Sequence, residues 1–276
     1  MTILSIIIIN YNTYKLTCNC ITSIIEKTRN IKYEIILVDN ASTECTPDKF
    51  KEKFATITLI RNNENRGFAV GCNDGIRLAQ GKYILLLNSD TILLNNAAAI
   101  CTDFLDKHPK TGVVTCRLEN QDSSPQHNCQ AFPSIKLMIA EKFRLHKFFP
   151  AALRAKIWLG LYFNYTKMSY VDWVWGTYFM FRREILSGFY ENKLPEDFFM
   201  YIEDMQWCLE FKKSGYKIAF FPEARVLHLG AKFNPKSQRM IVENQIRFVK
   251  ENYPFWKAKT ILFLNFLFKR LSPIEN

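Results

Sequence analysis

The chain has 276 residues, 48% of them hydrophobic, and a formal net charge of +11 at pH 7. This length and apolar content allow one α/β domain with a full core and an appended tail. The eight cysteines include no C-x-x-C pair, and residues 3–9 lack the basic flank and cleavage site of a secretory signal. We therefore expect free thiols in a reducing cytoplasm, which argues against a secreted, disulfide-bonded protein.

Apolar runs alternate with helical patterns through the first third of the chain. Each run is short and almost uninterrupted, which predicts strands buried on both faces of a sheet. Strands that alternate with helices at this spacing predict βαβ units and a mainly parallel sheet. The predicted strands lie at residues 3–9, 33–38, 56–60 and 82–87, and the predicted helices at residues 13–28 and 68–78.

Polar clusters follow three of these strands. They are residues 10–12 (Asn-Tyr-Asn), residues 39–40 (Asp-Asn) and residues 88–90 (Asn-Ser-Asp). A single cluster of this kind is more often a turn or a helix cap. In a parallel sheet, however, all three emerge at the edge where open α/β sheets bind ligands. We therefore expect a site for a nucleotide or a polyhydroxylated ligand at that edge.

Further motifs follow in the second half of the chain: Trp-Val-Trp-Gly at 173–176, a stretch at 198–204 that ends in Glu-Asp, and a stretch at 222–228 that ends in His. Together with the strand tips and residues 64–73, they resemble in the same order the family-2 glycosyltransferases of the GT-A fold. The similarity is greatest to the rhamnosyltransferase-type enzymes of bacterial surface-polysaccharide assembly. It implies an α/β fold with a mainly parallel central sheet flanked by helices, and an inverting, metal-dependent hexosyltransferase.

The resemblance assigns roles to the strand tips. Asp90 corresponds to the last acid of the family's Asp-x-Asp motif, whose first acid is Asn88 here, and would bind Mg²⁺ or Mn²⁺ bridging the donor diphosphate. Hard oxygen ligands suit both cations. The implied nucleotide-sugar contacts are Asn10, Asn12, Asp39, Asn73 and Asn88.

His228 is the implied second metal ligand. A lone histidine beside apolar residues is more often structural, but the family pattern has a metal-binding histidine at this place. Imidazole is an acceptable ligand for Mn²⁺ and a poor one for Mg²⁺.

Glu203 and Asp204 begin a predicted helix that runs to about residue 214. Acids at a helix start often only complement the helix dipole. Direct displacement at an anomeric carbon, however, needs a base for the acceptor hydroxyl, and the resemblance favours Asp204 for this role. Aromatic residues around Gly176 are either core or a platform for a sugar ring. The candidate acceptor or sugar contacts are Trp175, Gly176 and Glu203.

The positive charge is concentrated in two segments. Residues 134–169 contain seven Lys or Arg and one acid, and residues 232–276 contain nine and three. Both segments are rich in large apolar residues such as Phe148, Trp158 and Trp256, yet neither has an uninterrupted apolar stretch that could span a bilayer. Segments of this type bind the surface of anionic membranes; the alternative is a solvated face over an ordinary core helix. We expect peripheral association with the inner face of a membrane.

The predicted organisation is a GT-A catalytic domain followed by a tail. The catalytic domain (1–231) comprises a nucleotide-sugar-binding half (1–117), a basic amphipathic insert (118–170) and an acceptor or catalytic half (171–231), and the basic amphipathic tail is residues 232–276.

The expected reaction moves a sugar from a nucleotide donor to a glycan or lipid-linked glycan in surface-polysaccharide biosynthesis. Rhamnose from dTDP-rhamnose is the first choice and a UDP-hexose the alternative. A dinucleotide-binding oxidoreductase is disfavoured, because no G-x-G-x-x-G follows the first strand. The alternative from another class is a non-enzymatic, basic protein that binds nucleic acid or a membrane surface. We expect no nucleic-acid partner, since the strand-tip acids would repel phosphate unless a cation intervened.

Overall fold

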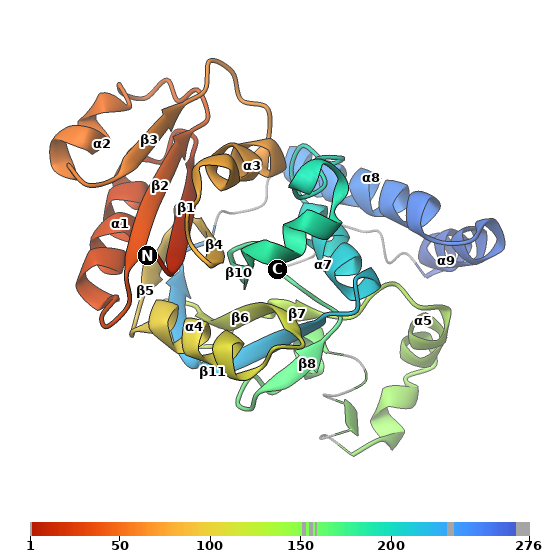
Figure 1. The fold of residues 1–276 in the computed structure, drawn as a ribbon. Coiled ribbons are helices and arrows are strands. Elements are labelled where there is room, and N and C mark those ends of the chain that lie inside the picture. The colour runs from red at the N-terminus through yellow and green to blue at the C-terminus, as the bar shows by residue number, and fades with distance from the viewer. Residues whose placement is uncertain (1, 151–152, 155–156, 158, 231–234, 269–276) are drawn as a thin grey trace.

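The computed structural model describes residues 2–150, 153–154, 157, 159–230 and 235–268. Its centre is a nine-stranded sheet with helices on both faces (Figure 1). The order is β3-β2-β1-β4-β10-β6-β11-β5, with β8 paired to β11. The strands of this sheet are β1 (Leu4–Asn10), β2 (Tyr33–Asp39), β3 (Thr58–Arg61), β4 (Tyr83–Asn88), β5 (Thr91–Leu93), β6 (Thr111–Glu119), β8 (Ser169–Val171), β10 (Tyr178–Arg182) and β11 (Lys217–His228).

The sheet is mixed: its first four strands in spatial order have the predicted parallel arrangement, whereas β5 and β8 run antiparallel to β11. Strands β3, β2, β1 and β4 run parallel to one another, β6 runs parallel to β11, and β10 lies antiparallel between β4 and β6. The first five residues of β4 are all buried, which fits a strand covered by helices on both faces. Register pairs Asn10 with Asp39 and Ile9 with Asn88. The three polar strand tips are therefore neighbours at one edge.

Two hydrophobic cores flank the sheet. Alternate residues of β1 point to opposite sides: Ile6 belongs to the core that contains Ile21 of α1, whereas Ile7 belongs to the core that contains Cys72 of α3 and Trp207 of α7. This alternation follows from the two-residue period of a strand. The helices are α1 (Tyr14–Lys27), α2 (Asp48–Lys53) and α4 (Ala97–Lys107) on the first side, and α3 (Phe68–Leu78) and α7 (Glu203–Lys213) on the second.

A third, smaller core joins the predicted insert and the predicted tail to the start of α7. Met138 of α5 (Ile135–Lys142), Phe248 of α8 (Pro235–Asn252) and Ile261 of α9 (Phe255–Leu267) pack with Ile202 and Met205. Figure 1 shows α8 and α9 at the same side of the sheet as α7. The basic segments thus contribute to the structure around Glu203 and Asp204. Trp158, Lys269 and Arg270, from the same two segments, lie outside the described residues.

The remaining elements are short. A two-stranded ribbon pairs β7 (Cys129–Gln130) with β9 (Trp173–Val174), and 3₁₀ turns include η1 (Leu145–Phe148), η2 (Gly160–Tyr162), η3 (Arg183–Gly188) and η4 (Tyr190–Asn192). All eight cysteines are free, and all but Cys45 are buried. Among the described residues, no helix combines the length and the apolar content that crossing a membrane requires.

Candidate active site

Asn10 and Asp39, at the tips of β1 and β2, bond directly to each other. The Asn10 amide nitrogen donates to Asp39 Oδ2 (2.6 Å) and Ser42 Oγ (2.9 Å), while its oxygen accepts from the hydroxyls of Thr13 (2.9 Å) and Thr17 (2.8 Å). Asn10 and Asp39 are each 1% exposed. In this state Asn10 orients Asp39, and both predicted nucleoside contacts are almost completely covered.

Asn12 ties the loop after β2 to the loop after β1. Its φ of 53° lies in the left-handed region, which asparagine tolerates better than most residues. Its side-chain oxygen accepts the backbone N–H groups of Thr43 (2.7 Å) and Glu44 (3.2 Å), and its own N–H donates to Ser42 Oγ (3.0 Å). The predicted contact Asn12 therefore anchors the segment that follows Asp39.

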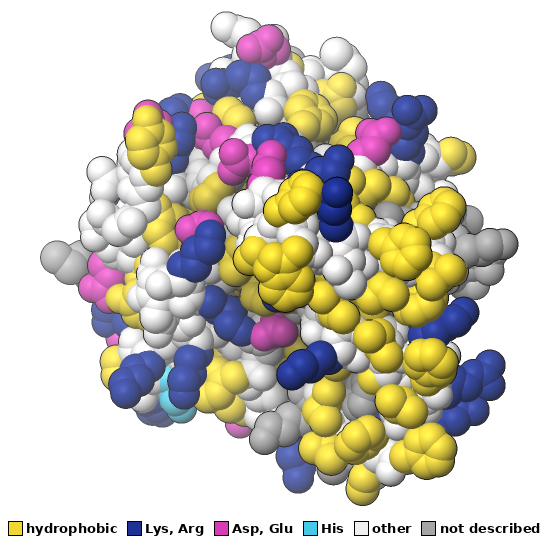
Figure 2. Space-filling view, turned by 90° about the vertical axis from the view of Figure 1, so that its right-hand side faces the viewer, with side chains coloured by type: hydrophobic (Ala, Val, Ile, Leu, Met, Phe, Trp, Pro, Cys, Tyr) yellow, Lys and Arg dark blue, Asp and Glu magenta, His cyan; other side chains and the backbone are white. Residues whose placement is uncertain are grey.

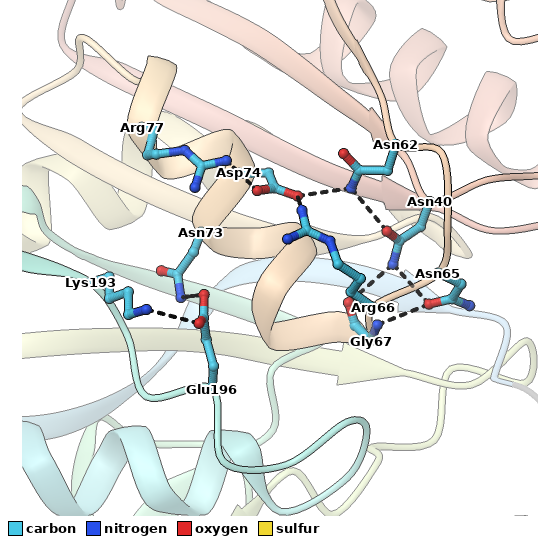
Figure 3. A network of polar contacts seen from close by, with 10 residues as sticks. All are labelled: Asn40, Asn62, Asn65, Arg66, Gly67, Asn73, Asp74, Arg77, Lys193 and Glu196. Atoms are coloured by element: carbon cyan, nitrogen blue, oxygen red, sulfur yellow. Dashed lines mark hydrogen bonds and ion pairs between the residues drawn. The ribbon is translucent and has the colours of Figure 1, made fainter. Parts of the chain in front are cut away.

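A buried amide and carboxylate network continues from β2 to α3 (Figure 3). Asn62 donates to Asn40 Oδ1 (3.0 Å) and to Asp74 Oδ2 (2.8 Å), and Asp74 also pairs with Arg66 and Arg77. Asp74 is buried, so these partners satisfy a carboxylate that would otherwise be costly to bury. The network fixes α3 against the strand tips.

Asn73 is turned toward a different segment of the chain. Its amide nitrogen donates to Leu194 O (2.8 Å) and Glu196 Oε1 (2.9 Å), and its oxygen accepts the N–H of Leu194 (3.0 Å). Figure 3 shows its amide directed at Glu196, away from the Asn62 side of α3. Its observed bonds hold the 194–196 segment against α3, which is a positioning role.

Asp90 and His228, the two predicted metal ligands, lie side by side. Asp90 lies in the two-residue connection between β4 and β5, His228 ends β11, and pairing of Thr91 with His228 brings them together. Asp90 Oδ2 is 3.4 Å from His228 Nε2, and their side chains are 18% and 12% exposed. The backbone reinforces the pair, because the N–H of Leu229 donates to Asp90 O (2.9 Å).

Gln126 orients the imidazole of His228. Its amide nitrogen donates to His228 O and to Asn120 Oδ1 (2.8 Å each), which turns its oxygen toward His228 Nδ1 at 2.7 Å. A neutral imidazole that donates from Nδ1 keeps its lone pair on Nε2. That lone pair then faces the Asp90 carboxylate. Two acceptors in this arrangement are stabilised by a cation between them, so the residues fit a divalent metal.

Asp90 and His228 would be the two protein ligands of such a metal. No group of three or more His, Cys, Asp and Glu side chains with the arrangement of a metal site occurs within the described ranges. Diphosphate and water oxygens would have to complete the coordination of Mg²⁺ or Mn²⁺. Asn88 lies beside this pair, and its N–H donates to Thr177 O (3.0 Å), which joins the tip of β4 to the segment entering β10.

Asp204 is partly exposed and held by two backbone donors. The N–H of Gly176 donates to its Oδ2 (2.9 Å) and the N–H of Met205 to its Oδ1 (2.8 Å). Burial raises the pKa of Asp204 to about 6, although these two hydrogen bonds oppose the shift. A carboxylate of this kind is ionised at neutral pH and more basic than an ordinary aspartate, which suits a general base.

Glu203 has the opposite environment. It is 6% exposed, and its Oε2 has no hydrogen-bond partner. Burial, and then the charge of Asp204, raise its pKa well above the usual range. Of the two neighbours, Asp204 is the one whose two carboxylate oxygens are both held by backbone N–H groups, whereas Glu203 is enclosed with Oε2 unbonded.

The turn before these acids is strained and is held by the tail. Tyr201 and Ile202 both have positive φ (67° and 75°), which costs energy for residues with large side chains. Asn244 of α8 donates to Met200 O (2.9 Å) and Tyr201 O (3.1 Å). The tail thus stabilises the conformation that presents Asp204.

Trp175 and Gly176 lie beside Asp204. Trp175 is partly buried against the first core, and its backbone N–H donates to Asn128 O (3.1 Å). Gly176 is buried, and a Cβ built there would lie 3.4 Å from the ring of Phe68 and 3.7 Å from Asp204 Cβ. In the structure Gly176 holds the Asp204 carboxylate through its N–H.

Sequence reasoning missed Ser42, Gln126 and Asn244. Gln126 is 102 positions from His228, and Asn244 is 43 positions from Tyr201. Gln126 and Asn244 lie in the segments predicted as insert and tail, and no local pattern marks either of them. Ser42 lies two residues beyond the predicted cluster at 39–40, and its bonds to Asn10 and Asn12 depend on the pairing of β1 with β2.

The chain matches the family model for glycosyl transferase family 2 over residues 5–188. It is 34% identical over 99 residues to a poly(ribitol-phosphate) beta-glucosyltransferase of Bacillus spizizenii, covering 34% of this chain and 16% of that protein. It is 32% identical over 123 residues to a poly-beta-1,6-N-acetyl-D-glucosamine synthase of Staphylococcus aureus, covering 40% and 30%. The matches thus span less than a third of these relatives.

The fold is also found in a solved structure. A crystal structure of residues 1–349 of Staphylococcus aureus TarS aligns with a TM-score of 0.59 and 15% sequence identity, covering 98% of this chain and 74% of that one. The α/β architecture, a central sheet flanked by helices, is that of the GT-A glycosyltransferases, as the sequence predicted. Because the family model matches about two thirds of the sequence, the chain belongs to glycosyl transferase family 2.

Proposed function

We propose that this protein transfers a sugar from a nucleotide donor to a hydroxyl group of a glycan acceptor, with inversion at the anomeric carbon. The observation that supports this most is Asp204, a partly exposed carboxylate fixed by two backbone N–H groups, with a pKa raised to about 6. A positioned base of this type contributes roughly 10² to 10⁴ in rate. Asp204 takes the proton of the acceptor hydroxyl as it attacks, and a single displacement inverts the configuration.

Asp90 and His228 would hold Mg²⁺ or Mn²⁺. The bound cation would supply Lewis-acid neutralisation of the charge that develops on the leaving nucleoside diphosphate. The imidazole ligand favours Mn²⁺ over Mg²⁺. Asp39 and the loop that Asn12 anchors form the nucleoside side of the proposed site, and Asn88 lies between the nucleoside and metal sides.

The donor is a nucleotide hexose. dTDP-rhamnose was the first expectation from the sequence, but the relatives reported above are named for glucose and N-acetylglucosamine polymers. Those names favour the UDP-hexose alternative. They also support a role in polysaccharide biosynthesis, with a glycan or lipid-linked glycan as the acceptor. We place this reaction in the cytoplasm, with the protein peripherally associated with the inner face of the membrane.

A thermal-shift screen tests the proposal and identifies the donor. The purified protein is heated with dTDP-rhamnose, UDP-glucose or UDP-N-acetylglucosamine, each with and without Mn²⁺. A ligand that binds only the folded state raises Tm. We expect one sugar nucleotide to raise Tm more in the presence of Mn²⁺, and the same compound to support sugar transfer. Stabilisation by single-stranded DNA alone, with no response to any sugar nucleotide, would reject the enzyme class.

A further inference from the structure

Helix α9 is apolar on both of its faces. Ala258 and Ile261 are buried in the third core, whereas Trp256, Phe263 and Phe266 are 66%, 62% and 81% exposed. The exposed residues recur at spacings of seven and three, so they lie along one stripe of the helix. Large aromatic side chains left in water are unusual for a helix whose opposite face already fills a core.

Helix α5 and the turn η1 extend this stripe. Phe143 and Phe148 are 67% and 83% exposed. The two helices are adjacent, since Lys142 Nζ of α5 lies 5.0 Å from the centre of the Phe268 ring at the end of α9. Figure 2 shows apolar side chains gathered on this side of the molecule, with Lys and Arg among and around them. We call this surface the docking face; it consists of Phe143, Phe148, Trp256, Phe263 and Phe266, with the cations described next.

The charge of the docking face is mainly positive. Residues 135–149 contain four Lys or Arg and one acid, and residues 253–268 contain two Lys and no acid. Several of these cations lie over aromatic rings: Lys257 Nζ is 4.3 Å from the ring centre of Tyr253, and Lys259 Nζ is 4.5 Å from that of Phe255. A lysine in this position covers apolar surface with its alkyl chain and keeps its ammonium group at the boundary with water.

We propose that the docking face binds the surface of an anionic lipid bilayer. Such a surface offers apolar contact for the aromatic rings and negative headgroups for the cations, and a face of this composition needs both. A second copy of the same face is disfavoured, because it would bring like charges together. The docking face thereby specifies which residues make the peripheral membrane contact proposed above, and it does not depend on the sugar-transfer chemistry.

The docking face is connected to the catalytic segment. Ala258 and Ile261, on the inner side of α9, share the third core with Ile202 and Met205, which flank Glu203 and Asp204. Deletion of residues 257–276 would therefore remove core contacts as well as the exposed rings. Substitution of exposed residues alone separates membrane binding from folding.

The test is co-sedimentation of the full chain with vesicles of phosphatidylcholine alone or mixed with phosphatidylglycerol. We expect the wild type to bind the mixed vesicles. The triple variant W256S/F263S/F266S should partition at least tenfold less, and K142Q/K259Q should lose affinity for the mixed vesicles only. The matched control is L78S/Y190S, which removes two apolar side chains that are also exposed but lie outside α5, η1 and α9. It should bind as the wild type does.

The proposal is overturned if the wild type ignores anionic vesicles, or if the triple variant binds as well as the wild type while unfolding at the same temperature. A triple variant that becomes monomeric from a dimer, with unchanged vesicle binding, would instead assign the face to self-association. Transfer to a soluble acceptor should persist in the triple variant. If the wild type transfers sugar but does not bind anionic vesicles, the docking face is rejected and the proposed function is unaffected.

Discussion

The polar groups on the two sides of the proposed site differ in how completely they are hydrogen-bonded. On the nucleoside side, Asn10 uses both its amide nitrogen and its oxygen in hydrogen bonds within the chain, and buried Asp74 is paired with Arg66, Arg77 and Asn62. On the catalytic side, Glu203 Oε2 is buried without a partner, and the raised pKa of Asp204 reflects its burial.

This difference separates positioning from chemistry. A polar group whose bonds are all satisfied stabilises one geometry, and removing it costs stability. A group left with unfavourable solvation has a perturbed pKa, which is useful for proton transfer. We therefore expect substitutions on the catalytic side to affect turnover more than stability, and the reverse on the nucleoside side.

Asp204→Asn should have the largest effect. The amide cannot accept a proton from the acceptor, so kcat should fall by about 10³ or more, at the upper end of what a general base contributes. Nucleotide affinity should be unchanged, because Asp204 lies outside the nucleoside side. Stopped-assay kinetics and calorimetric titration of the nucleotide measure the two quantities. Turnover within tenfold of the wild type would remove Asp204 from the role of base.

The neighbouring acid provides the matched control. Burial raises the pKa of Glu203 well above the usual range, and the side chain is almost completely covered, so the neutral isostere in Glu203→Gln should change kcat much less than Asp204→Asn does. In the wild type, kcat/KM should fall about tenfold per pH unit below a midpoint of about 6, because Asp204 must be deprotonated to act. A midpoint near 4 would mean that burial does not tune this base.

Asn10→Ala tests the nucleoside side of the proposed site. The substitution leaves Asp39 and the hydroxyls of Thr13 and Thr17 without their shared partner, and should lower the free energy of unfolding by about 2 to 3 kcal/mol. Nucleotide affinity should fall as well, since Asp39 loses its orientation. Urea unfolding and nucleotide titration give the two values.

Asn73→Ala is the counterpart on the far side of α3. It also removes buried hydrogen bonds, here to Leu194 and Glu196, so a similar loss of stability is expected. Unchanged nucleotide affinity in this variant would support a positioning role for Asn73. A loss of nucleotide affinity as large as that of Asn10→Ala would instead support the direct donor contact that the sequence predicted.

The sequence predicted the elements that local patterns define. The strands at 3–9, 33–38 and 82–87 and the helix at 68–78 agree with β1, β2, β4 and α3 to within one residue at each end. Their tips meet because parallel strands end at one edge. The adjacency of Asp90 and His228 was also anticipated, through the family resemblance, although their metal binding stays a prediction.

Local sequence patterns could not predict contacts between distant segments. The insert and the tail were predicted as two separate basic segments, yet Met138 and Ile261 share one core in the structure. Amphipathic patterns identify which residues avoid water, but they do not identify the partner that covers them. For the same reason the sequence did not predict the role of Asn244, whose hydrogen bonds hold the strained turn before Asp204.

Gln126→Leu tests the smallest expected effect, at the metal pair. Leucine has a similar size but cannot accept the proton of His228 Nδ1, so the imidazole is free to carry its proton on Nε2 instead. Loss of a residue that orients a metal ligand typically lowers metal affinity by about 10- to 100-fold. We expect roughly a tenfold loss of metal affinity here, because Asp90 and the diphosphate remain.

Titration of Mn²⁺ followed by electron paramagnetic resonance measures binding without turnover. Asn120→Ala is the control, since Asn120 accepts from the Gln126 amide nitrogen, which also donates to His228 O, and its loss should change Mn²⁺ affinity much less. Equal affinity in Gln126→Leu and the wild type would show that His228 needs no oriented tautomer, and would place the metal on Asp90 and the donor alone.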